Sequence, residues 1–429
     1  MGWWQIMERE FRTELTFAKE LDAKDPLRNI RDRFYVQSNE IYMDGNSLGL
    51  ASKDAEKALL KMMDIWKNEG IKLWDGLFHY AGKLGEMSAP LINAYPEEVV
   101  ITGSTTINIH QCISTLYKPN KERYKILVDD LNFPTDRYAI DSQVRLHGYD
   151  PKEAVKVVKS ADGRFIDESA IIEAMTEEVA IILLPTVLYR SSQVLDMKRV
   201  TAAAHQRGIL IGWDLCHAIG AIPMDFKEID PDFAVWCTYK YLSAGPGSIA
   251  GLYMNQKHFK ETPGLAGWWG NKDDTQFELK HEFEHQRDAS GWQIGSPSFL
   301  AMAPLEGTLS IFNEVGMTKI REKSLSITAY LMYLIDEKLT KYGYSIGNPR
   351  EDNKRGGHVC LEHEEAYRIC KALKAAKIIP DFREPNVIRL APIALYNTYE
   401  EVYTLVETLE DIAMNKIYEQ FSNERTLVV

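Results

Sequence analysis

The sequence predicts an α/β protein built on a largely parallel sheet. Short apolar runs rich in β-branched residues recur through the middle of the chain, and stretches with helical periodicity separate several of them. Such intervening stretches are long enough for the crossovers that join parallel strands, with helices on both faces of the sheet. The chain has 429 residues, 45% of them hydrophobic, which is enough to bury a sizeable core.

The individual elements follow from these periodicities. Residues 52–69 form a predicted helix, because Ala55, Ala58, Leu59, Met62, Met63 and Trp66 fall on one apolar face. Helices are also predicted over 168–175 and 197–207. The predicted strands are residues 99–102, 125–129, 180–185, 209–214, 233–238 and 249–254.

From about Pro304 the pattern changes to amphipathic helices over 305–339, short strands near 357–361 and 387–390, and a helix over 399–419. We therefore expect three parts. Residues 1–50 form an N-terminal segment that packs on the small domain or on a dimer partner, with Trp3 and Trp4 docking it. Residues 51–304 form a large α/β domain, and residues 305–429 form a smaller α+β domain.

Composition excludes several classes of function. With 50 Lys and Arg against 62 Asp and Glu, the net charge is −12, and no basic run is present, so neither nucleic acid nor an anionic membrane surface is an expected partner. Residues 1–8 lack the features of a signal peptide, and no apolar run reaches membrane-span length, so a cytoplasmic protein is expected. The five cysteines form no Cys-x-x-Cys pair, which predicts reduced, mostly buried thiols. His281 and His285 lack a third metal ligand, and we interpret them as solvated polar residues.

Two strand ends carry residues suited to chemistry. The strand over 209–214 ends in Asp214, and Lys240 follows the next strand along the chain. In open α/β sheets ligands bind beyond the carboxyl ends of the strands. A lysine beside a buried carboxylate is what pyridoxal phosphate needs, because the lysine forms a Schiff base and the carboxylate keeps the pyridine nitrogen protonated. The simpler alternative is a helix-capping aspartate and a solvent-exposed lysine, and spacing alone favours it.

Two further features point to the same cofactor. The strand over 99–102 leads into Gly-Ser-Thr-Thr106 and a helical pattern, so Thr105 and Thr106 could hold a phosphate at a helix N-terminus, although an ordinary N-cap is the alternative. Phe133 follows the strand over 125–129 and could stack on a flat ring, although aromatic residues there more often join the core. The joint occurrence of phosphate cradle, aromatic, aspartate and lysine favours one cofactor site.

The sequence resembles the kynureninase family, whose members are fold type I pyridoxal-phosphate enzymes of the aminotransferase superfamily. The resemblance runs over nearly the whole chain. It is carried by Asp44-Gly-Asn-Ser-Leu-Gly-Leu50, Phe133-Pro-Thr-Asp136, Trp213-Asp-Leu-Cys-His-Ala218, Trp236-Cys-Thr-Tyr-Lys-Tyr-Leu242, Gly267-Trp-Trp-Gly270 and Asp381-Phe-Arg-Glu-Pro-Asn-Val-Ile-Arg-Leu-Ala-Pro392.

The resemblance implies roles at matching positions. Lys240 would carry the cofactor, Asp214 would pair with the pyridinium nitrogen, and His217 would lie close by. Thr105, Thr106 and Tyr239 would hold the phosphate, with Tyr239 also taking part in catalysis, while Phe133 and Asp136 would complete the cofactor site. Trp268 would reach the phosphate of the neighbouring subunit's cofactor, which implies a homodimer. The remaining implied contacts, to the substrate's amino-acid end, are Asn46, Ser47 and Arg389.

Three positions depart from patterns seen in the family. Pro185 stands where a serine can lie near the phosphate, so any hydroxyl contact would come from Thr186 or elsewhere. Ser296, expected to border the cofactor and the aromatic end of the substrate, stands where some members carry asparagine. Trp74 lies in a bacterial-type motif and would stand beside the substrate ring.

The resemblance implies hydrolysis of the Cβ–Cγ bond of L-kynurenine to anthranilate and L-alanine, within tryptophan catabolism. A second candidate substrate is 3-hydroxykynurenine, which would give 3-hydroxyanthranilate. Another fold type I activity, such as a cysteine desulfurase or an aminotransferase, would share Asp214 and Lys240. A desulfurase needs a nucleophilic cysteine on a mobile loop, whereas Cys360 lies in an apolar, strand-like context. A non-catalytic binding protein that kept the fold is the alternative from another class.

Overall fold

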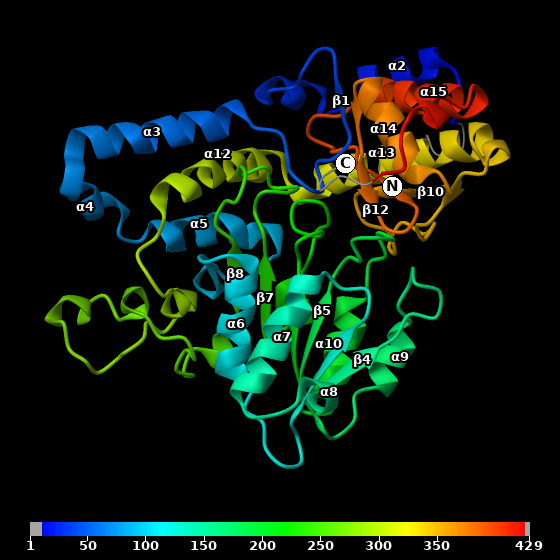
Figure 1. The fold of residues 1–429 in the computed structure, drawn as a ribbon. Helices are drawn as coiled ribbons and strands as arrows, with labels where there is room; N and C mark the ends of the chain where they lie inside the picture. The colour runs from blue at the N-terminus through cyan, green and yellow to red at the C-terminus, as the bar shows by residue number, and fades with distance from the viewer. Residues whose placement is uncertain (1–10, 425–429) are drawn as a thin grey trace.

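The computed structural model describes residues 11–424, and a seven-stranded sheet forms the centre of the molecule. The strand order is β2-β8-β7-β6-β5-β3-β4, and the pairs among β3, β4, β5, β6 and β7 are all parallel. Strand β8 runs antiparallel to both of its neighbours, β7 and β2. The predicted α/β class with a mostly parallel sheet is confirmed (Figure 1).

All six predicted strands are present, with ends that differ by at most two residues from the prediction. The seventh, β4, pairs only with β3 at the sheet edge, and this short strand, half-buried at its centre, did not stand out as an apolar run. The strands of this sheet are β2 Val99–Ile101, β3 Lys125–Asp129, β4 Val155–Val158, β5 Val179–Pro185, β6 Leu210–Asp214, β7 Phe233–Trp236 and β8 Gly251–Met254.

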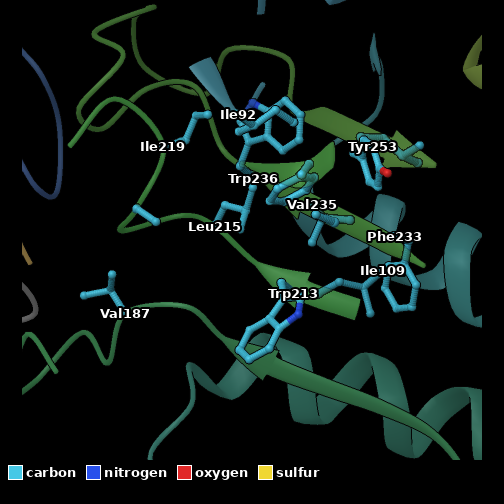
Figure 2. Close-up of a cluster of buried hydrophobic side chains, with 14 of the residues drawn as sticks. Ile92, Ile109, Val187, Trp213, Leu215, Ile219, Phe233, Val235, Trp236 and Tyr253 are labelled. Atoms are coloured by element: carbon cyan, nitrogen blue, oxygen red, sulfur yellow. The ribbon is translucent and has the colours of Figure 1, made fainter. Parts of the chain in front are cut away.

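Helices cover both faces of this sheet, as parallel pairing requires. They include α5 Tyr80–Ser88, α6 Thr105–Leu116, α7 Pro134–Leu146, α8 Pro151–Ala154, α9 Glu168–Glu173, α10 Met197–His205 and α11 Phe226–Ile229. Figure 2 shows large side chains of β6, β7 and β8, among them Trp213, Phe233 and Tyr253, packed with Ile109 of α6. Because these side chains are almost wholly buried, the sheet is a rigid base for the residues beyond its strand ends.

Helix α3 (Lys53–Glu69) leads into the short α4 (Leu73–Leu77), and α3 lies alongside α12 (Phe299–Val315), far away in sequence (Figure 1). Gly307 makes this close approach possible, because a Cβ there would lie 2.2 Å from the carbonyl oxygen of Asp54. The predicted apolar face of α3 is only partly covered. Ala55 and Met62 are buried, but Trp66 is 55% exposed.

A second, four-stranded antiparallel sheet of order β12-β13-β10-β9 lies in the C-terminal part. Its strands are β9 Ser345–Ile346, β10 Val359–Glu362, β12 Asp381–Arg383 and β13 Val387–Leu390, and the helices around it are α13 Met317–Lys338, α14 Ala366–Ala375 and α15 Tyr399–Met414. The amphipathic helices predicted over 305–339 are α12 and α13, and Gly316, with a φ of 82°, separates them.

The N-terminal region packs on this second sheet and its helices. Phe17 and Leu21 of α2 (Leu15–Lys24) share a hydrophobic cluster with residues of α13 and α15. Strand β1 (Ile41–Tyr42) pairs in parallel with β11 (Ile378–Ile379). Trp3 and Trp4, which we expect to dock this region, lie outside the described residues. Across residues 11–424 no helix has both the length and the apolar composition to cross a membrane.

Candidate active site

The carboxyl ends of the parallel strands open into one cavity of about 380 Å³. This is within the size range of small-molecule sites, and it lies where open α/β sheets bind ligands. The cavity gathers most of the residues that the sequence singled out, from segments far apart in the chain. Those lining it are Asn46, Ser47, Thr105, Thr106, Phe133, Asp214, His217, Tyr239, Lys240 and Arg389.

Asp214 and Lys240 meet in this cavity because they follow adjacent parallel strands. Asp214 ends β6 and pairs in register with Val235 of β7, and Lys240 follows β7 after four residues. The Asp214 carboxylate does accept a local backbone bond, from the N–H of Cys216 at 2.7 Å, yet it also faces the cavity. Lys240 is half-buried and lines the cavity, so the alternative of a solvent-exposed lysine does not describe it.

His217 is the nearest polar partner of the lysine. Its Nε2 lies 3.0 Å from Nζ of Lys240. Burial and the positive charge of Lys240 hold the pKa of His217 well below its ordinary value, so the imidazole is neutral. When Lys240 is charged it can only donate, and Nε2 then accepts, which leaves the proton on Nδ1. That Nδ1 is buried and has no hydrogen-bond partner among residues 11–424, so it is available to a ligand.

Asp136 lies beside the cavity on α7 and is buried. One of its oxygens accepts from the Asn132 amide at 2.8 Å, and the other, Oδ1, has no partner among the described residues. Burial, followed by the negative charge of Asp214, raises the pKa of Asp136 well above its ordinary value. A carboxyl group with a raised pKa can be protonated and can then donate a hydrogen bond.

The N-terminus of α6 forms a polar end of the cavity. Ser104 is the N-cap and accepts from the N–H of Ile107, while the Thr106 hydroxyl lies 2.7 Å from that of Thr135 on α7. Backbone N–H groups at a helix N-terminus, the helix dipole and several hydroxyls together suit a phosphate. Thr186 does not contribute, because its hydroxyl contacts the sulfur of Met197 away from the cavity.

Phe133 is the N-cap residue of α7, and its ring is 46% exposed towards the cavity instead of joining the core. Nζ of Lys240 lies 5.9 Å from the centre of this ring. Tyr189, from the loop after β5, meets the ring edge-on with centroids 5.8 Å apart. An exposed ring beside the lysine is suited to stacking on a planar cofactor.

The segment from Asp44 to Leu50 closes the cavity on another side, and its glycines explain how. A Cβ on Gly49 would lie 2.4 Å from the carbonyl oxygen of Lys240, so only glycine lets this segment lie against the lysine loop. The Gly49 N–H donates to the carbonyl of Tyr239 at 2.8 Å. Asn46 is fully buried, lines the cavity, and has no partner for either amide atom among the described residues.

Arg389 of β13 reaches the same cavity from the second sheet. The side chain is 1% exposed, and its Nε donates to Oδ2 of Asp381 at 2.5 Å. Its Nη1 donates to the carbonyl of Tyr189 at 3.1 Å, and its Nη2 donates to the hydroxyl of Ser47 at 2.9 Å. A buried guanidinium held in one plane is preorganised to bind a carboxylate.

Several cavity residues were missed by sequence reasoning. Arg383 lines the cavity together with Arg389, and it lies in the same quoted motif, which was the available signal. Thr135 also lies in a quoted motif. Tyr189 and the hydroxyl of Ser248 had no signal, because only the folding of distant loops brings them to the cavity.

Besides Asp136, three more predicted site residues do not line this cavity. Trp74, Trp268 and Ser296 are absent from its lining, and Ser296 is exposed. The two tryptophans belong to an aromatic cluster in which the ring centre of Trp74 lies 5.1 Å from that of Trp269 in a tilted arrangement, and Trp268 meets Phe277 edge-on with centroids 5.4 Å apart. Trp268 is 41% and Phe277 is 68% exposed. Within a single chain these residues form an exposed aromatic surface.

The interpretation of His285 as a solvated residue is wrong, whereas His281 is exposed. His285 is 3% exposed, and its Nε2 lies 3.1 Å from the carbonyl oxygen of Phe259. Neighbouring charges suggested a solvated segment, but the His285 ring packs against Trp292.

Comparison with solved structures identifies the fold. A cysteine desulfurase from Thermococcus onnurineus superposes with a TM-score of 0.78 and 17% identity, over 90% of this chain and 98% of that one. A cysteine desulfurase from Escherichia coli gives a TM-score of 0.74 and 18% identity, over 91% of this chain and 98% of that one. At this identity the likeness concerns the fold alone, and it confirms the fold type I architecture that the sequence resemblance implied.

Comparison of sequences is more specific. A family model described as the kynureninase C-terminal domain matches residues 320–409. Kynureninase from Geobacillus thermodenitrificans is 56% identical over 96% of this chain and 98% of its own length. Kynureninase from Bacillus anthracis is also 56% identical, over 99% of this chain and 100% of its own length, and that from Shouchella clausii is 50% identical over 96% of this chain and 97% of its own. Since the identity extends over nearly the full length of each relative, the chain belongs to the kynureninase family.

Proposed function

We propose that this protein hydrolyses the Cβ–Cγ bond of L-kynurenine to anthranilate and L-alanine in tryptophan catabolism, with pyridoxal 5′-phosphate bound in the cavity around Lys240. The observation that carries the proposal is the convergence of Lys240, Asp214 and Arg389 on one cavity at the carboxyl edge of the sheet. The family membership established above supports the same reaction.

The residues present fit this cofactor. The α6 N-terminus and the hydroxyls of Thr105 and Thr106 suit its phosphate, and the exposed ring of Phe133 suits its planar ring. Two buried atoms without a partner among the described residues, Nδ1 of His217 and Oδ1 of Asp136, are available for hydrogen bonds to polar substituents of that ring. When bound, pyridoxal phosphate supplies an electron sink for a carbanion at the substrate.

The protein's own groups supply attachment, charge and proton transfer. The Lys240 amine is the nucleophile that attaches the cofactor, and once displaced by the substrate amine it is free to carry a proton at the substrate's α-carbon. Neutral His217 holds Nζ of Lys240 at 3.0 Å and so orients the amine. The Asp214 carboxylate would keep the ring nitrogen protonated, and Tyr239 would contact the phosphate. Tyr239 lines the cavity, and its hydroxyl is neutral because burial raises its pKa.

The amino-acid end of the substrate is bound by Arg389, with Asn46 and Ser47 beside it. A buried guanidinium favours a carboxylate strongly, since both partners are desolvated. The unpartnered amide of Asn46 offers one donor and one acceptor group in the same cavity. This arrangement supports an α-amino acid as the substrate class.

We further propose a homodimer in which the exposed aromatic cluster meets the partner's cavity. Trp268 would then reach the partner's cofactor phosphate, and Trp74 and Ser296 would border the aromatic end of the partner's substrate. The exposure of Trp268 and Phe277, together with that of Trp66 on α3, supports a covered surface in the assembly. A cytoplasmic location is supported by five buried free cysteines, which persist in a reducing compartment.

The structure gives no support to the cysteine desulfurase alternative, which needs a cysteine nucleophile on a mobile loop. All five cysteines are buried, and Cys360 lies within β10 with a thiol whose pKa is raised by burial. A thiol in the middle of a sheet is not a mobile nucleophile.

The test is a product assay on the protein saturated with pyridoxal phosphate. The visible spectrum is recorded first, and L-kynurenine is then added while anthranilate fluorescence is followed. We expect a bound-cofactor band and anthranilate and alanine in equal amounts. A colourless protein would support a non-catalytic role, and sulfide release from L-cysteine without anthranilate would support a desulfurase.

A further inference from the structure

His358 immediately precedes β10 of the second sheet. It is buried and does not line the cavity. The residue is 1% exposed, and its ring centre lies 5.7 Å from that of His217. No direct contact with a cofactor or substrate follows from its position, because His217, 3.0 Å from Lys240, lines the cavity and His358 does not. Its polar contacts lead instead to Arg389.

The ring of His358 joins three groups. Its Nε2 lies 3.1 Å from the carbonyl oxygen of Tyr189, and its Nδ1 lies 3.3 Å from the hydroxyls of both Tyr241 and Ser192. Because a carbonyl can only accept, Nε2 carries the proton and Nδ1 accepts from the hydroxyls. Burial, and next the positive charge of Arg389, lower the pKa of His358 to about 3, so the ring keeps one donor and one acceptor at neutral pH.

The Tyr189 carbonyl is shared with the substrate-facing arginine. Nη1 of Arg389 donates to this oxygen at 3.1 Å, while Asp381 fixes Nε on the opposite side of the guanidinium. Asp381 lies on β12, beside β13, whereas Tyr189 lies in the loop after β5 of the large sheet. The plane of the Arg389 guanidinium therefore depends on the position of the Tyr189 carbonyl, which this loop determines.

Contacts elsewhere fix the ends of the loop. Val187 and Val194 form a bridge, and Ser192, at a left-handed φ of 61°, accepts from the N–H of Gly356 at 2.7 Å. At Tyr189 itself the carbonyl oxygen is held by the donors of His358 and Arg389. Removing the His358 donor would leave the Tyr189 carbonyl with the Nη1 donor of Arg389, whose position this carbonyl helps to fix.

We propose that His358 is a positioning residue: by fixing the Tyr189 carbonyl it sets the plane of the Arg389 guanidinium and so strengthens binding of the substrate's α-carboxylate. This inference rests on the proposed role of Arg389 as the carboxylate-binding residue. His358→Gln keeps an N–H donor and an oxygen acceptor at similar reach, whereas His358→Leu removes both.

The test compares two ligands of the protein saturated with pyridoxal phosphate. L-Alanine carries the carboxylate and ethylamine does not, and the Kd of each is measured from changes in the visible spectrum. For His358→Leu we expect the Kd of L-alanine and the KM of L-kynurenine to rise about tenfold, with the Kd of ethylamine and kcat changed less than about twofold. His358→Gln should restore most of the L-alanine affinity.

A double variant checks the route of the effect. If His358 acts through Arg389, then His358→Leu combined with Arg389→Lys should bind L-alanine no more weakly than Arg389→Lys alone. Should His358→Leu lack a cooperative thermal transition, His358→Asn replaces it, because its shorter amide cannot span both partners.

The outcomes separate the two proposals. Unchanged L-alanine affinity in His358→Leu, or in His358→Asn where it replaces that variant, or an equal loss for ethylamine, would overturn the positioning role while leaving that of Arg389 intact. Unchanged L-alanine affinity in Arg389→Lys would instead overturn the carboxylate-binding role itself.

Discussion

The Nζ atom of Lys240 lies 3.0 Å from Nε2 of His217, in a cavity where burial keeps the imidazole neutral. A neutral acceptor orients the lysine amine without adding a second positive charge beside it. The Lys240 amine is thus held by a residue that follows Asp214 at the same strand end, so the amine, its imidazole acceptor and the carboxylate come from the ends of two adjacent strands.

Asp214→Asn should still bind pyridoxal phosphate but turn over slowly. The neutral amide keeps the size of the side chain and cannot hold the ring nitrogen in its cationic form, which the electron sink requires. We expect kcat to fall roughly 100-fold or more, the size of one lost electrostatic stabilisation. Steady-state kinetics at measured cofactor occupancy provide the check, and a near-normal kcat would mean that another acid serves the ring.

Arg389→Lys should weaken substrate recognition. A point charge does not reproduce the planar fork that Asp381, Tyr189 and Ser47 hold in place. The expected loss in kcat/KM corresponds to roughly 2 to 5 kcal/mol. Arg350→Lys is a matched control, because that arginine pairs with Asp336 at the surface. Equal kcat/KM in the wild type and Arg389→Lys would rule out recognition by the fork.

L-Kynurenine is predicted to be preferred over 3-hydroxykynurenine. In the proposed dimer Trp74 would offer a flat wall with one indole donor beside the substrate ring, and Ser296 is shorter than an asparagine, so the extra hydroxyl would be desolvated without a good partner. The ratio of kcat/KM values for the two substrates measures this preference. Ser296→Asn should move the ratio towards 3-hydroxykynurenine, and a wild-type preference for the hydroxylated substrate would contradict the prediction.

The buried ion pair between Lys323 and Asp25 should stabilise the packing of the N-terminal region on α13. Nζ and Oδ2 are 2.7 Å apart, and each side chain is 3% exposed. Lys323→Met leaves an uncompensated buried carboxylate and should lower the free energy of unfolding by roughly 3 to 5 kcal/mol. Adding Asp25→Leu should recover much of that loss. Denaturant unfolding measures the free energy of unfolding of both variants. A further decrease on adding Asp25→Leu would contradict the stabilising pair.

The ends of the strands could be predicted from the sequence, because the local pattern of apolar residues determines where each strand ends. Apolar runs locate β6 and β7, and counting past their ends finds Asp214 and Lys240. The contacts that hold Arg389 could not be found this way, since Tyr189 and Asp381 reach it from different sheets. Periodicity could not predict that Trp66 is exposed either, because it identifies the apolar face of a helix but not the residues that cover that face.

The attachment of pyridoxal phosphate to Lys240 is the central claim, and borohydride reduction followed by tryptic mapping tests it most directly. Reduction fixes the cofactor to its lysine and blocks cleavage there. We expect the pyridoxyl group on one peptide covering residues 228–257, uncleaved at Lys240, and its disappearance in Lys240→Ala, with the exposed Lys260→Ala as an unaffected control. Recovery of the pyridoxyl group on a peptide from elsewhere in the chain, with residues 228–240 released unmodified, would contradict the account.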